Sequence, residues 1–187
     1  MENETPPWKP ELDAIVGARH GGQVTTLLAR LQDLDRRHPH VAEINYQIAW
    51  TCDVLGRHAE ALPYYERAVA LGLPANELAN ALIGLGSTLR QLGQHQRSRD
   101  VLEGGRIQFP ENREFDAFLA LTYHNLGEHA RALELLLQVL IDTSEDVGIT
   151  AHQRALRFQA SRLSETPPAE IAPAQPVRGT GAGAETN

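Results

Sequence analysis

Residues 54–72 read VLGRHAEALPYYERAVALG, and the start of this stretch returns twice further along the chain. The chain reads QLGQHQRSRDVLEGG from Gln91 and NLGEHARALELLLQVL from Asn125. All three stretches share Leu-Gly, a polar residue and a histidine. A motif that recurs in this way indicates a stack of similar units, because one small unit cannot bury its own apolar face.

The spacing of four glycines gives the length of the unit. Gly22, Gly56, Gly93 and Gly127 are separated by 34, 37 and 34 residues. Repeats of this length are typical of stacked architectures. A three-residue insertion near residues 73–75 accounts for the longer interval.

Apolar residues on both sides of these glycines have helical spacing. After the first glycine they are Leu27, Leu28, Leu31 and Leu34, and after the last they are Leu133, Leu136, Leu137 and Leu140. A helix often ends in a left-handed residue, a conformation that glycine adopts at little cost. Each unit is therefore predicted to be a helix, a glycine turn and a second helix.

A helical hairpin of 34 residues resembles the tetratricopeptide repeat. In that register the small residue of the first helix is Ala49, Gly86 or Ala120 in successive units. The resemblance covers roughly residues 8–146 and implies an all-α fold, an α-solenoid of about four helix-turn-helix repeats. The predicted units are a diverged 8–39, followed by 42–75, 79–112 and 113–146.

A stack of hairpins needs a capping helix at its end. Residues 147–163 are the candidate, with Ala151, Ala155 and Phe158 on the helical face that we expect to be buried.

Two adjacent glycines interrupt the third unit. Gly104 and Gly105 lie inside its predicted second helix, where each costs about 1 kcal/mol relative to alanine. This unit is therefore predicted to be the softest.

The two ends of the chain differ from the middle in composition. Residues 164–187 read SETPPAEIAPAQPVRGTGAGAETN, in which proline, glycine and alanine make up half of the segment. We expect this tail and residues 1–7 to be disordered, because such segments bury little apolar surface. A solvated extension and a proline-rich docking segment are both consistent with the tail's composition.

Composition excludes several classes of protein. The net charge is −7 overall and −3 for residues 8–163, with no basic stripe, so nucleic acid is not an expected partner. No apolar run is long enough for a membrane span, and residues 1–12 lack the pattern of a secretory signal. One cysteine, Cys52, excludes an internal disulfide and fits a reducing compartment, so a cytoplasmic chain is predicted.

The sequence contains few candidates for metal ligands, catalytic residues or a phosphate-binding loop. His58, His95 and His129 occupy equivalent positions in successive units, so a helix spacing of about 8 to 10 Å separates them, whereas zinc holds its ligands at about 2 Å. Cys52 falls at a core position, where a thiol is usually inert. The GLGST segment at residues 84–88 lacks the strand and the lysine of a phosphate loop. We predict neither metal, cofactor nor catalysis.

The resemblance implies a groove lined by positions 2, 5, 9 and 12 of the first helices. The residues there are Glu43, Tyr46, Trp50 and Asp53, then Asn80, Ile83, Ser87 and Arg90, then Glu114, Ala117, Leu121 and His124. Tyr46 and Trp50 form an aromatic pair of the kind that anchors interfaces, although Trp50 could instead only pack against the first unit. One subgroup of the family grips terminal carboxylates with Lys and Asn at positions 5 and 9, and no helix here carries that pair.

The predicted function is a non-catalytic scaffold or adaptor that binds a peptide segment or a helix of another protein in this groove. An enzyme is the alternative if an acid, a base and a nucleophile converge in a pocket. A homo-oligomer joined through the groove is another alternative.

Overall fold

The computed structural model describes residues 5–21 and 24–165, and all secondary structure in these ranges is helical. This confirms the all-α prediction. The elements are α1 (Lys9–Gly17), the 3-10 helix η1 (Ala18–Gly21), α2 (Val24–Arg37), α3 (Ala42–Val54), α4 (His58–Leu71), α5 (Ala75–Gln91), α6 (His95–Gln108), α7 (Glu114–Asn125), α8 (His129–Thr143) and α9 (Val147–Ala160). The predictions for Gly22, for residues 1–4 and for residues 166–187 lie outside the described residues.

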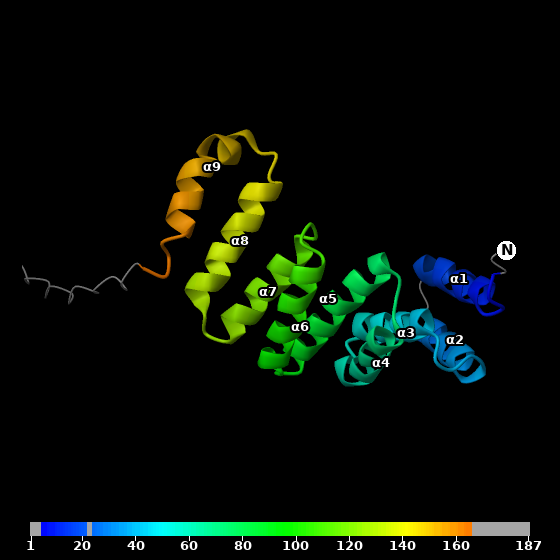
Figure 1. The fold of residues 1–187 in the computed structure, drawn as a ribbon. Helices are drawn as coiled ribbons and strands as arrows, with labels where there is room; N and C mark the ends of the chain where they lie inside the picture. Colours follow the sequence, from blue (N-terminus) through cyan, green and yellow to red (C-terminus); the bar gives the residue numbers. More distant parts are fainter. Residues whose placement is uncertain (1–4, 22–23, 166–187) are drawn as a thin grey trace, which may run out of the picture.

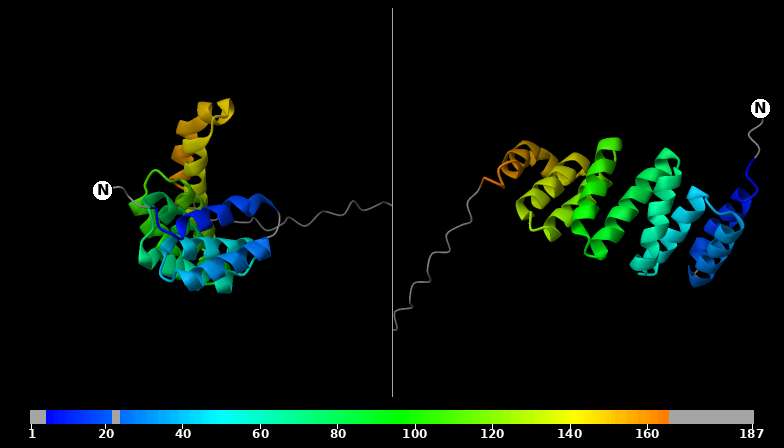
Figure 2. Two further views of the ribbon diagram at one scale, coloured as in Figure 1. Left: turned by 90° about the vertical axis from the view of Figure 1, so that its right-hand side faces the viewer. Right: turned by 60° about the horizontal axis from the view of Figure 1, so that its bottom comes forward.

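The helices follow one another in chain order along a single row, from α1 at one end to α9 at the other (Figure 1). Figure 2 shows the same row from two further directions. Each helix packs against the next, and α5 also contacts both α3 and α7. The first helices of successive hairpins therefore form one continuous layer, as a solenoid requires.

The glycine turns have the predicted conformation. Gly56, Gly93 and Gly127 have φ of 70°, 74° and 81°, in the left-handed region that favours glycine. The residue after each glycine donates its N–H to a carbonyl five residues earlier, which closes the end of the first helix. The second helix then begins at the repeated histidine of each unit.

The longer glycine interval has a helical explanation. Helix α5 begins at Ala75, directly after Pro74, and has 17 residues, whereas α3 has 13 and α7 has 12. The inserted residues therefore extend the N-terminal end of α5, and the preceding loop, residues 72–74, is shorter than residues 109–113 between α6 and α7.

Small residues allow close helix packing, as predicted. Ala49 is fully buried. A Cβ atom at Gly86 would lie 2.5 Å from Leu102 Cγ of α6, and one at Gly84 would collide with the Tyr65 ring of α4. Helix α5 thus needs glycine on the sides that receive these two large side chains.

The predicted buried face of the capping helix is wrong. Ala151 and Ala155 are exposed, and Phe158 is 57% exposed. Helix α9 instead turns Ile149, Leu156 and the fully buried Ala160 away from solvent, and it packs against α8. The side chains that lose contact with water are those on the face that meets α8.

None of the helices in residues 5–21 and 24–165 combines the length and apolar character that a membrane crossing requires.

Candidate functional site

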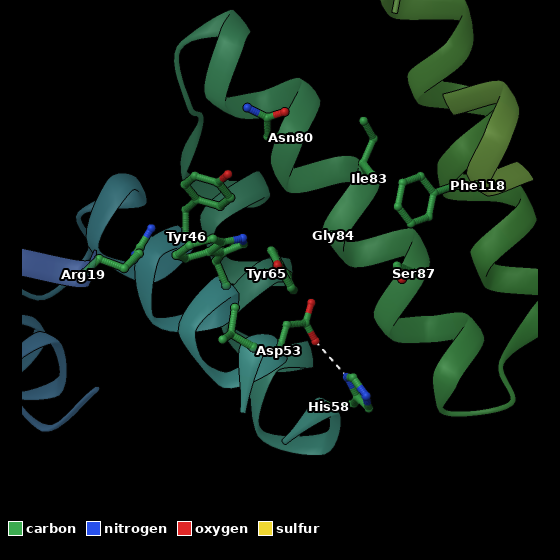
Figure 3. A pocket seen from close by; sticks show the side chains of 12 residues that line it. Arg19, Tyr46, Asp53, His58, Tyr65, Asn80, Ile83, Gly84, Ser87 and Phe118 are labelled. Carbon is green, nitrogen blue, oxygen red and sulfur yellow. Dashed lines mark hydrogen bonds and ion pairs between the residues drawn. The ribbon is translucent and has the colours of Figure 1, made fainter. Parts of the chain in front are cut away.

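A cavity of about 600 Å³ opens on the layer of first helices (Figure 3). In Figure 3, Arg19 lies on one side of this cavity and Phe118 on the other, with Asn80 and Ile83 along α5 between them. The lining residues are Arg19 of η1, Tyr46, Trp50, Asp53 and Val54 of α3, His58 and Tyr65 of α4, Asn80, Ile83, Gly84 and Ser87 of α5, and Phe118 of α7.

Aromatic rings form much of the cavity wall. The Arg19 guanidinium lies over the Trp50 ring, 3.5 Å from its centroid. The Tyr46 and Tyr65 rings lie 6.4 Å apart at an angle of 49°. Burial raises the pKa of both tyrosines, so both phenols stay neutral at physiological pH. Trp50 therefore packs against the first unit and faces the cavity at the same time.

Asp53 is held in place by two neighbours. Both of its carboxylate oxygens lie 2.9 Å from the Thr88 hydroxyl, which donates from α5, and Oδ1 also lies 2.9 Å from His58 Nδ1. These contacts tie α3 to α5 and to the start of α4. They also satisfy much of the carboxylate's hydrogen-bonding capacity.

A comparison with protein families matches residues 42–163 to the family described as "Tetratrico peptide repeat". The chain belongs to this family. The match covers the helical hairpins from α3 onward, and the resemblance to tetratricopeptide repeats that the glycine turns and small residues predicted is confirmed there.

Solved structures with the same fold include tetratricopeptide-like arrays. The structure of MamA from Desulfovibrio magneticus RS-1 superposes with a TM-score of 0.65 at 16% identity, covering 84% of this chain and 91% of that one. A structure of PilF from Pseudomonas aeruginosa superposes with a TM-score of 0.62 at 15% identity, covering 84% and 73%. Identities this low show the shared fold alone. The curated proteins contain no match to the sequence.

The tetratricopeptide register places six of the predicted groove residues around one cavity. They are Tyr46, Trp50 and Asp53 of α3 and Asn80, Ile83 and Ser87 of α5. The other predicted residues lie on α3, α5 and α7 but do not line the cavity; they are Glu43, Arg90, Glu114, Ala117, Leu121 and His124. Their contact with a partner stays a prediction.

Sequence reasoning missed half of the lining. Gly84 and Phe118 occupy position 6 of their tetratricopeptide units, so adding that position to the predicted groove would have found both. Tyr65 of α4 is only 1% exposed, yet it lines the cavity. Arg19 had no signal, because it belongs to η1 in the diverged first unit.

Polar groups in the cavity are available to a ligand. Within the described part of the chain, the Asn80 amide and the Ser87 hydroxyl form no hydrogen bond with another protein group. Asn80 is exposed and Ser87 is half-buried. An amide and a hydroxyl can each pair with a peptide backbone, because both can donate and accept.

The cavity contains a histidine and a serine, two residue types that hydrolases use for catalysis. His58 pairs with Asp53, and Ser87 lines the same cavity, but no hydrogen bond joins His58 to Ser87 in residues 5–21 and 24–165. Ser87 also lies inside α5, where the backbone N–H groups are engaged in the helix and cannot stabilise an oxyanion.

Two of the repeated histidines contact the first helix of their own hairpin. His129 Nδ1 lies 3.1 Å from His124 Nδ1, and His58 has Asp53 as its neighbour. Over the ranges that the structure describes, no group of three or more potential metal ligands comes together.

Cys52 provides a test of the packing beneath this site. Burial raises the pKa of its thiol to about 11, and the side chain is fully buried. Because only the thiolate is nucleophilic, we expect the native chain at pH 8 to react with a disulfide reagent at least about 100-fold more slowly than the urea-unfolded chain. The two rates are measured by absorbance. Equal rates would contradict this burial.

Proposed function

We propose that this tetratricopeptide repeat chain is a non-catalytic scaffold or adaptor of the cytoplasm that binds a peptide segment or a helix of another protein in the groove formed by α3, α5 and α7. The observation that carries this proposal is the aromatic cavity of about 600 Å³ on the first-helix layer. Its volume falls within the usual range for ligand sites, about 300 to 1,000 Å³. Buried aromatic side chains of the kind found here dominate binding energy at interfaces.

The distribution of polar groups supports a polypeptide ligand. Asn80 and Ser87 stand along α5 next to the apolar Ile83, so that a chain lying along this helix would meet both hydrogen-bonding groups and an apolar contact. Extended solenoid surfaces commonly serve such binding.

Two matched isoleucine variants test this proposal. Ile83 lines the cavity, whereas Ile107 of α6 is 82% exposed and does not line it. We expect Ile83→Asp to abolish capture of partner proteins from the native host, because a carboxylate in the cavity would be desolvated by the ligand. Ile107→Asp introduces the same charge and should leave capture unchanged.

Melting curves for both variants establish that they are folded. Equal capture by Ile83→Asp and the parent chain would contradict the proposal. The mass of the purified chain in solution separates a different protein partner from a second copy: a dimer that Ile83→Asp dissociates would make the groove a self-association surface.

A further inference from the structure

Arginines in the described residues mostly form ion pairs with carboxylates, at N–O distances from 2.6 to 3.8 Å. The arginines without such a pair in this part of the chain are Arg19, Arg30, Arg67, Arg90 and Arg154. Arg30, Arg67 and Arg154 are exposed, whereas Arg19 and Arg90 are half-buried. A half-buried cation loses solvation that a nearby anion would normally offset.

Arg19 is a cation at the edge of the cavity. Its Nη2 donates to Gln47 Oε1 at 2.6 Å, and its guanidinium lies over Trp50. Its Nε is buried without a hydrogen-bond partner in the described residues. Burial lowers the pKa of this guanidinium, which nevertheless stays charged at physiological pH. The stacked, planar group is pre-organised to bind a carboxylate at its free edge.

Arg90 repeats this situation further along the same face. It lies one turn after Ser87 on α5, and its Nη1 donates to Asn125 Oδ1 at 3.2 Å. Its Nε is also buried without a partner in the described part of the chain. The groove therefore carries two half-buried cations, one of them at the cavity, that pair with no carboxylate in residues 5–21 and 24–165.

Acidic groups near the cavity do not neutralise Arg19. Asp53 is the one acidic side chain among the lining residues, and it is engaged with Thr88 and His58. The net charge of −7 disfavours an anionic ligand at long range. Salt screens that repulsion beyond about 8 to 10 Å, whereas a direct, partly buried ion pair is screened much less.

We propose that the groove recognises an acidic segment of a partner protein, in which an Asp or Glu side chain pairs with Arg19 while a neighbouring apolar side chain enters the cavity between Ile83 and Phe118. This inference rests on the proposed function and specifies its ligand. It differs from the family's Lys and Asn carboxylate clamp, because Arg19 comes from η1 and lies outside the predicted clamp positions.

Peptide selection tests the charge preference. Random short peptides displayed on phage are selected on the immobilised full-length chain, on Arg19→Gln and on Arg67→Gln. Arg67 is the matched control: it lies over the Tyr64 ring at 4.8 Å, has no carboxylate partner in the described residues and is outside the cavity lining. The parent and Arg67→Gln should select peptides with Asp or Glu close to a large apolar residue. Arg19→Gln should retain the apolar residue and lose the acidic enrichment.

A double-mutant cycle then measures the ion pair. A synthetic peptide from the selection should bind Arg19→Gln about ten-fold more weakly than the parent. Its amide analogue, with Gln or Asn in place of the acid, should lose the same factor on the parent and nothing further on Arg19→Gln.

Each other outcome has a defined meaning. The proposal of an acidic ligand is overturned if the selected peptides show no acidic enrichment, or if Arg67→Gln loses that enrichment as much as Arg19→Gln does. If Ile83→Asp still abolishes binding of the selected peptides, the proposed function stands. Failure to select peptides, or binding that Ile83→Asp leaves unchanged, overturns both.

The chain's own tail contains Glu170 next to Ile171. If a chain ending at Glu165 binds the peptide several-fold more tightly, and Arg19→Gln removes that gain, the tail is the occupant and the assignment to a partner is overturned.

Discussion

Replacing Gly105 with alanine is expected to destabilise the chain by about 2 to 3 kcal/mol, whereas the same change at Gly104 should stabilise it by about 0.5 to 1 kcal/mol. Both residues lie in α6. A Cβ atom at Gly105 would collide with the ring of Phe115, while one at Gly104 would meet nothing within 4 Å. The two substitutions therefore add the same methyl group to different sides of one helix.

Phe115 cannot easily move to accept the extra atom. Its side chain is fully buried, and its ring stacks on Phe109 at 6.2 Å with an interplanar angle of 5°. At Gly104 the only consequence of alanine is a higher helix propensity. Urea unfolding of both variants gives their free energies of unfolding. If the slope of this free energy against urea concentration is the same as in the parent, unfolding exposes the same amount of surface. A stability loss of equal size at both positions would mean that the Phe115 ring does not govern the response of this helix.

These two glycines illustrate what the sequence could and could not predict. The sequence predicts a cost at both positions, because propensity depends on residue type and secondary structure alone. The contact with Phe115 depends on how α6 and α7 approach each other, which the sequence does not state. The low helix propensity of Gly105 is therefore offset by the close packing of Phe115 against it. Gly104 has the same low propensity but no such contact.

The architecture was more predictable than the site. Regular glycine spacing, helical apolar patterns and small residues at one position act together along the array, so one irregular unit did not change the prediction. The site depends on single side chains from different units. Arg19 reaches it from η1, where the repeat register carries no information, and position 6 contributes through Gly84 and Phe118.

The face of α9 shows a second limit. Helix α9 has two partly apolar faces, one with Ala151, Ala155 and Phe158 and the other with Ile149 and Leu156. The choice between them depends on where α8 lies, because only the face that meets α8 can bury its side chains. A pattern in one helix predicts that a face is apolar but does not by itself decide which partner covers it.

Ala49 and Trp50 are adjacent in the sequence and should respond in opposite ways to substitution. Ala49→Leu is expected to destabilise the chain by about 1 to 3 kcal/mol, because Ala49 is fully buried at a close helix packing. Trp50→Ala should weaken binding of a peptide selected on the parent, one with a large apolar residue, by about 2 kcal/mol or more, because it removes a large part of the cavity wall. Without the indole ring the Arg19 guanidinium has no aromatic face to stack on, which should lower the stability by about 0.5 to 1 kcal/mol.

Paired melting curves and fluorescence-anisotropy titrations of that peptide separate the two effects. Ala49→Leu should lower the melting temperature while the remaining folded protein binds with the parent's affinity. Trp50→Ala should melt close to the parent and bind at least about 30-fold more weakly. The competing interpretation is that Trp50 only packs against the first unit. In that case Trp50→Ala should lower the melting temperature and leave the affinity for the peptide unchanged. A Trp50→Ala chain that melts far below the parent yet binds the peptide equally well would show that Trp50 is a core residue and not part of the binding groove. The stacking of Arg19 on Trp50 would then contribute to stability and not to ligand binding.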